Sequence, residues 1–163
     1  MNNNEKNAVK NICKFCLTNY QIQGSSRLIS SLIYQLCREI GIDAPAVEGI
    51  LYVDIKGHRR PFSHCFNVIN CDIIDCTIYS YALANKSISE LFPAYIIGTP
   101  PDHLDYVIDK EIKPDSQFKF QKHYLQDIIS QLDNYSDVKI ERFTEYEDAK
   151  KQNLFYAGTR YQL

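Results

Sequence analysis

Three segments rich in β-branched and aromatic residues follow one another in the middle of the chain, at residues 46–54, 63–70 and 72–78. The last two are joined by the tight turn Asn70-Cys71-Asp72, so an antiparallel meander is the simplest arrangement of the three. A small antiparallel sheet is therefore predicted at the centre of the fold.

Apolar residues at helical spacing predict helices on both sides of these strands. They cover residues 5–20, 26–40 and roughly 118–135, and Gly41 is expected to end the second helix. Residues 87–98 are typical of a short helix or turn that runs into a strand. Prolines break up residues 100–115, and the charged last thirty residues fit no clear pattern. With 163 residues, 45% of them hydrophobic, we expect one α+β domain over residues 1–163.

The charges are nearly balanced, with 18 basic and 20 acidic residues, a formal net charge of −2 and a pI near 6.1. Such a chain offers no strong field for a nucleic acid or an anionic membrane, and we expect neither as a partner. The N-terminus has no apolar stretch after a basic start. We expect a cytoplasmic protein, or one exported without a classical signal peptide. The oligomeric state is not indicated.

The six cysteines are too sparse for a disulfide scaffold, and we expect free thiols. Cys13, Cys16, Cys71 and Cys76 could be combined into a zinc site. However, Cys13 and Cys16 lie in a helical pattern, and Cys71 and Cys76 have opposite parities along a short strand. Buried thiols that act as small apolar residues are the better interpretation. No metal and no cofactor are expected.

One histidine and one aspartate on neighbouring predicted strands suggest chemistry. Alternation places His64 on one face of its strand and Asp75 on a face of the next, opposite or diagonal to it. A buried carboxylate is costly without a partner, so a hydrogen bond between the two is expected. Such a pair is a base with its orienting acid, and a nucleophile is best placed at a helix N-terminus packed on that sheet. In this chain that position is Ser25-Ser26.

The stretch GSSRLISSLIYQLCREIGIDAPAVEG, followed by FSHCFNVINCDIIDCT, resembles the core of the transglutaminase-like branch of the papain-like superfamily. In that family, Gly-x-Cys-Arg opens the core helix, and His and Asp follow on successive strands. The resemblance covers roughly residues 20–80, with residues 81–163 completing the domain. It implies a papain-like α+β fold in which the helix with the nucleophile position packs on a small antiparallel sheet.

The resemblance assigns Ser26 to the nucleophile position, His64 to the base and Asp75 to the orienting acid. It implies acyl transfer from an amide of a protein or peptide through a covalent acyl-enzyme: transglutamination, deamidation or peptide hydrolysis. The hydroxyl of Ser26 is then expected within roughly 4 Å of the imidazole, on the side away from Asp75. The backbone N–H of Ser26 and the side-chain amide of Gln21 or Gln23 are the candidates for the oxyanion hole.

The serine departs from the family pattern, because a hydroxyl must lose its proton as it attacks, whereas a thiol can rest as thiolate. Three explanations compete: an introduced inactivating Cys-to-Ser substitution, a natural pseudoenzyme, or a true serine nucleophile. The alternative function is a catalytically silent papain-like module that binds a protein or peptide. In that case Ser26 is only a helix cap and His64 an ordinary strand histidine.

Overall fold

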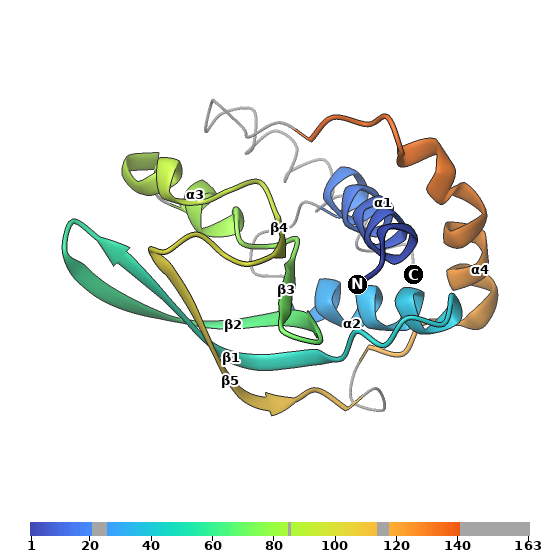
Figure 1. Cartoon of the computed structure of the whole chain (residues 1–163), viewed down its shortest axis with the longest axis horizontal. Helices are drawn as coiled ribbons and strands as arrows, with labels where there is room; N and C mark the ends of the chain where they lie inside the picture. The colour runs from blue at the N-terminus through green and yellow to red at the C-terminus, as the bar shows by residue number, and fades with distance from the viewer. Residues whose placement is uncertain (21–25, 85, 114–117, 141–163) are drawn as a thin grey trace, which may run out of the picture.

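The computed structural model describes residues 1–20, 26–84, 86–113 and 118–140, and shows an α+β fold (Figure 1). In chain order its elements are α1 (Asn3–Asn19), α2 (Ser26–Glu39), β1 (Ala46–Ile55), β2 (His58–Ile69), β3 (Asp72–Asp75), α3 (Ser80–Ala84), the 3₁₀ helix η1 (Lys86–Leu91), β4 (Ile96–Gly98), β5 (Leu104–Glu111), α4 (Lys122–Gln131) and the 3₁₀ helix η2 (Leu132–Tyr135). No helix in these described ranges combines the length and apolarity needed to cross a bilayer.

The predicted helices form, and local signals set their ends. A capping box opens α1, in which the side chain of Asn2 accepts from the backbone of Glu5 and the Glu5 side chain accepts from the backbone of Asn2. Gly41 has a positive φ of 81° and closes α2, with its N–H bonded to the carbonyl of Arg38. The predicted C-terminal amphipathic segment forms α4 and continues as η2.

The predicted antiparallel meander forms the centre of a five-stranded sheet with the order β4-β3-β2-β1-β5. Strand β2 begins at His58, five residues earlier than the composition indicated. The β1–β2 connection is therefore only Lys56-Gly57, and both residues have positive φ, of 51° and 79°. Two positive φ values in a two-residue loop match the twist of the flanking strands, so the hairpin remains paired to its tip.

Residues 104–111 correct the interpretation of the proline-containing region. They form β5, the strand at one edge of the sheet, paired antiparallel with β1. The prolines come before and after this strand in the sequence, so they mark its ends and remove none of its hydrogen bonds. The β1–β5 register shifts between Glu48 and Gly49.

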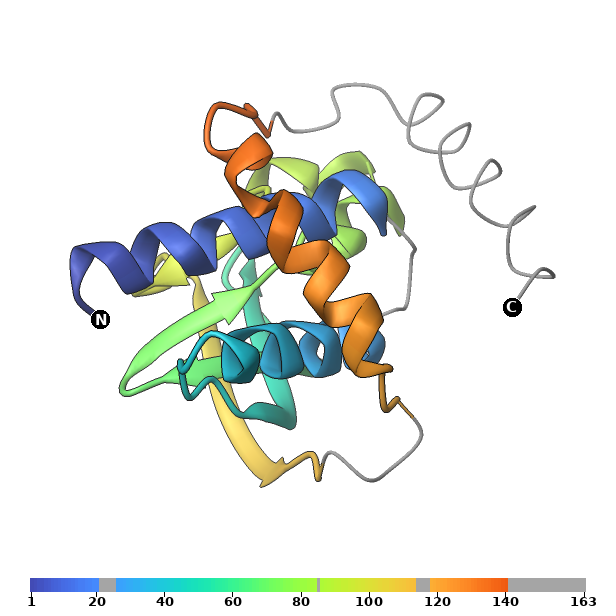
Figure 2. The same ribbon diagram turned by 90° about the vertical axis from the view of Figure 1, so that its right-hand side faces the viewer.

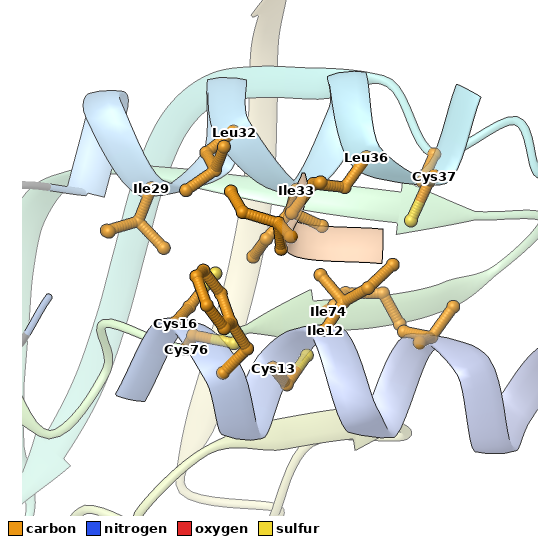
Figure 3. Packing of buried hydrophobic residues seen from close by; sticks show 14 of the residues in the cluster. Ile12, Cys13, Cys16, Ile29, Leu32, Ile33, Leu36, Cys37, Ile74 and Cys76 are labelled. Carbon is orange, nitrogen blue, oxygen red and sulfur yellow. The ribbon is translucent and has the colours of Figure 1, made fainter. Parts of the chain in front are cut away.

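The two faces of the sheet carry separate apolar clusters. Helices α1, α2 and α4 pack over one face, and α4 bridges α1 and α2 (Figure 2). Four buried cysteines, Cys13, Cys16, Cys37 and Cys76, belong to this cluster, and Figure 3 shows them together with isoleucines and leucines of α1 and α2. The other face, with Phe66, packs against α3 and η1.

The structure bears out the interpretation of the cysteines as thiols within the core. All six are free, and five of them are buried while Cys71 is exposed. Burial raises the pKa of the Cys16 and Cys76 thiols, so these sulfurs remain protonated. Within the described ranges, no group of three or more histidine, cysteine or acidic residues could hold a metal ion.

Candidate functional site

His64 and Asp75 meet on the sheet face opposite α2. The register of β2 and β3 pairs Asn67 with Ile74, which places Asp75 diagonal to His64 on the same face. Nε2 of His64 lies 2.6 Å from Oδ2 of Asp75, and each side chain is only 1% exposed. The hydrogen bond predicted between these two residues is therefore present.

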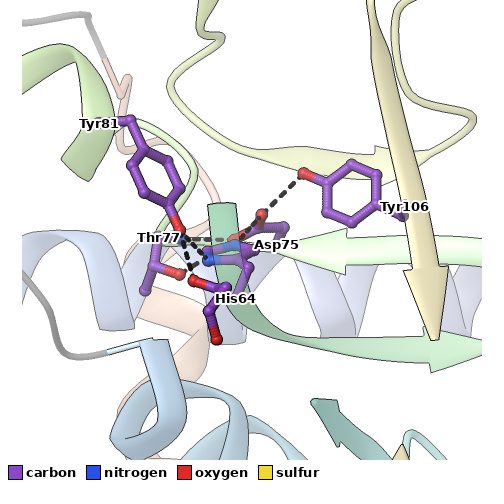
Figure 4. Close-up of polar contacts among 6 residues, drawn as sticks. His64, Asp75, Thr77, Tyr81 and Tyr106 are labelled. Atoms are coloured by element: carbon purple, nitrogen blue, oxygen red, sulfur yellow. Dashed lines mark hydrogen bonds and ion pairs between the residues drawn. The ribbon is translucent and has the colours of Figure 1, made fainter. Parts of the chain in front are cut away.

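The carboxylate of Asp75 is fully satisfied. Oδ1 accepts hydrogen bonds from the backbone N–H and the hydroxyl of Thr77, at 2.8 and 3.1 Å. Oδ2 accepts one from the hydroxyl of Tyr106 at 2.8 Å, in addition to the contact with His64 (Figure 4). Burial acts to raise the pKa of Asp75, but the charge of His64 and these hydrogen bonds outweigh it and lower that pKa. Asp75 is therefore ionised at neutral pH.

The second ring nitrogen of His64 is also occupied. The hydroxyl of Tyr81, from α3, lies 3.0 Å from Nδ1 and 3.0 Å from the backbone carbonyl of Ser63. An ionised carboxylate can only accept, so Nε2 carries a proton that it donates to Asp75. Tyr81 then either donates to Nδ1 of a neutral ring, or accepts from Nδ1–H of a charged ring while donating to Ser63. In both states Nδ1 has a partner.

Both tyrosines of this cluster are held in the neutral form. Burial, followed by the nearby charge of Asp75, raises the pKa of Tyr81 and of Tyr106. The ring of Tyr81 also packs against the imidazole, with centroids 5.3 Å apart. Tyr81 therefore acts as a hydrogen-bonding partner of His64 and lacks the phenolate that a nucleophile would need.

Ser26 is the first residue of α2, as the sequence indicated. Its side chain is near enough to the Cys65 thiol to act on the pKa of that thiol, which burial raises and Ser26 acts to lower. The approach of the Ser26 hydroxyl to the imidazole of His64 stays a prediction. Cys65 follows His64 on β2, so alternation directs its side chain to the α2 face of the sheet while the imidazole points to the other face. The structure thus brings His64 and Asp75 together and places Ser26 near Cys65, the neighbour of His64 on β2.

The start of α2 carries a second polar group beside Ser26. Arg27 lies 3.7 Å from the carboxylate of Glu48 on β1, and Lys110 on β5 lies 3.5 Å from the same carboxylate. Both pairs are partly exposed; the Arg27–Glu48 pair connects α2 to the sheet, as expected of a helix-flanking charge, and the Lys110–Glu48 pair joins β5 to β1. Gln21, Gln23 and Ser25 lie outside the described residues.

Comparison of the chain with family models, curated proteins and solved structures finds no match. Its function must therefore be argued from the geometry of the site.

Two members of the cluster, Tyr81 and Tyr106, were not found from the sequence. Tyr106 lies on β5, where Leu104, Tyr106 and Ile108 alternate along a strand that the flanking prolines concealed. That alternation was an available signal. Tyr81 lies in the short helix α3, and only the tertiary structure brings it to His64.

Proposed function

We propose that this chain is a catalytically silent α+β module that binds a protein or peptide, on a scaffold similar to that of the transglutaminase-like branch. The observation that carries the proposal is the engagement of both nitrogens of the His64 ring, by Asp75 at 2.6 Å and by Tyr81 at 3.0 Å. A general base needs one free acceptor nitrogen within reach of the proton it takes.

The burial of the imidazole supports the same proposal. The His64 side chain is 1% exposed, and aromatic rings of Phe66, Tyr81 and Tyr106 surround it. An acyl group or a leaving amine would have to displace part of this wall to exchange a proton with the ring. The pair therefore fits a structural role, in which a satisfied buried network holds β2, β3, β5 and α3 together.

The position of Ser26 is the second support. Ser26 lies near Cys65, whose side chain points to the sheet face opposite the imidazole. Without a base, a serine hydroxyl is a weak nucleophile. In this role Ser26 is only the first residue of α2.

The test of this proposal is the reaction of the natural chain with a fluorophosphonate, which modifies activated serines covalently. Intact-mass analysis should show no adduct at neutral pH under conditions that fully modify a serine protease run in parallel. Peptide mapping should find Ser26 unmodified. A stoichiometric adduct on Ser26 that disappears in His64→Gln would overturn the proposal.

Acyl transfer remains a second candidate, favoured by the 2.6 Å contact that orients the imidazole. In that reaction the oxygen of Ser26 would bond to an amide carbonyl carbon and its proton would pass to Nδ1 of His64. The C–N bond would then break and the amine would leave with that proton. Water or a second amine would next take the acyl group and return a proton to Ser26.

This second candidate requires the hydroxyl of Tyr81 to leave Nδ1. Tyr81→Phe removes that hydroxyl and keeps the ring. If acyl transfer is the function of a latent site, Tyr81→Phe should create fluorophosphonate reactivity at Ser26. If the module is silent, the variant should react no more than the natural chain.

A further inference from the structure

A groove lies beside the tip of the β1–β2 hairpin, on the same sheet face as His64. Its lining includes Ile55, Lys56, Arg60, Phe62, Tyr81 and Ile88. The hairpin contributes one wall, and α3 with η1 contributes the other. Figure 1 shows the hairpin extending beyond the rest of the sheet, away from α1 and α4. We call this feature the hairpin groove.

The floor of the hairpin groove is aromatic and aliphatic. The rings of Phe62 and Tyr81 pack with centroids 4.8 Å apart, tilted by 48°. Ile55 and Ile88 are partly buried beside them. Such a floor can take up a large apolar side chain, and partly exposed aromatic rings are typical of surfaces that anchor a partner.

Two cations, Lys56 and Arg60, stand at the rim of the groove. Lys56 and Arg60 are both exposed, and neither has an acidic partner in the described parts of the chain. The neighbouring Arg59 differs, because alternation sends it to the other face, where it pairs with Asp105 and stacks on the ring of Tyr52 at 4.2 Å. The two cations that have no acidic partner among the described residues therefore face the groove, and Arg59 does not.

We propose that the hairpin groove binds an extended acidic peptide segment of a partner protein, with an aromatic or large aliphatic side chain between acidic residues. The carboxylates would pair with Lys56 and Arg60, and the apolar side chain would pack on Phe62 and Tyr81. This inference rests on the proposed binding function and names its site and partner chemistry. A stacked nucleobase fits less well, because the two rings are tilted and offer no single flat platform.

The groove also touches the buried network. Tyr81 lines it with one part of its ring, and its hydroxyl holds Nδ1 of His64. A side chain that packs on Tyr81 would therefore change the environment of the His64 imidazole. Binding in this groove should shift the ring proton resonances of His64, whereas binding elsewhere on the surface should not.

The experiment measures fluorescence anisotropy of a fluorescein-labelled peptide that has one phenylalanine with two glutamates on each side. The double variant Lys56→Glu/Arg60→Glu should bind it at least about tenfold more weakly, since two attractive pairs become repulsive. The matched control Lys10→Glu changes an exposed lysine on α1 and should bind as the natural chain does. Circular dichroism verifies that all variants are folded.

Further probes separate the contributions of charge, apolar contact and partner class. Replacing the glutamates by glutamine, or the phenylalanine by alanine, should weaken binding of the peptide to the natural chain, and Phe62→Ala should do the same from the protein side. A labelled oligothymidine tests a nucleic acid in the same groove and should bind more weakly than the peptide. Natural-abundance NMR should show the shift of His64 on adding the peptide.

The proposal is overturned if the peptide does not bind, if the charge-reversed variant binds it as tightly as the natural chain, or if oligothymidine binds more tightly. The fluorophosphonate reaction of Ser26 decides the proposed function separately. A silent Ser26 with no groove-dependent binding therefore rejects the groove alone, and a reactive Ser26 rejects the silent module whatever the peptide does.

Discussion

The hydroxyl of Tyr81 lies 3.0 Å from Nδ1 of His64, the ring nitrogen that a neighbouring nucleophile would need. The other nitrogen is bonded to Asp75, so the imidazole is the centre of a closed buried network. The His64–Asp75 pair, which the resemblance identifies as base and acid, therefore does not by itself indicate activity, because Nδ1 of His64 also has a partner. Here a tyrosine from the short helix α3, just beyond the resembling motifs, takes that place.

Asp75→Asn should destabilise the fold strongly. The variant keeps the shape of the side chain but removes the charge that His64, Thr77 and Tyr106 surround. Breaking a buried pair in this way typically costs about 3–5 kcal/mol of unfolding free energy. Urea unfolding, monitored by circular dichroism, measures this loss of stability, with the exposed Asp109→Asn as control. Equal midpoints for the two variants would show that the network contributes nothing to stability.

The stability of the natural chain should fall in acid because of Asp75. Its pKa is lowered in the folded state, so the folded protein releases this proton more readily than the unfolded chain does. The resulting stabilisation is complete above the unfolded value, near pH 4, and is lost as the pH falls through the folded pKa. Unfolding free energies between pH 6 and pH 2 should therefore decline less steeply in Asp75→Asn. Parallel curves would exclude Asp75 as the cause.

Gly49→Ala should disturb the edge of the sheet. A Cβ atom at this position would lie 2.0 Å from the backbone carbonyl oxygen of Val107, so β5 would have to move. Overpacking against backbone costs about 1–3 kcal/mol or more, and hydrogen exchange at Val107 and Ile108 should accelerate. Gly57→Asn, at the hairpin tip, is the contrasting variant, because asparagine tolerates a positive φ and no atom lies within 4 Å of its Cβ. Equal exchange rates in both variants would contradict the close approach.

Local signals in the sequence were enough for much of this fold. Apolar spacing placed α1, α2 and α4, Gly41 marked the end of α2, and strand alternation brought His64 to Asp75. These features depend on residues near one another in the chain. The pairing of β5 with β1 and the contact of Tyr81 with His64 were not foreseen, because each joins segments whose partner only the tertiary structure supplies.

The surroundings of the Ser26 side chain show the same limit of prediction from the sequence. Helix position and residue order were sufficient to place it at the start of α2. They could not tell which face of β2 its side chain would lie near, because the neighbours His64 and Cys65 point to opposite faces. The packing of α2 on one face of the sheet decides that question.

The most direct test of the central claim is the alkylation of Ser26→Cys by iodoacetamide at pH 6.5, compared with the same variant carrying His64→Gln. The exposed Cys71 serves as the internal reference for an ordinary thiol. A helix N-terminus alone can raise the reactivity of a thiol, so the comparison between the two proteins decides the question. If His64 is engaged by Asp75 and Tyr81, the labelling rate at position 26, relative to Cys71, should be the same in both. A rate that falls about tenfold or more when His64 is replaced would show that the imidazole activates position 26 and would contradict the silent module.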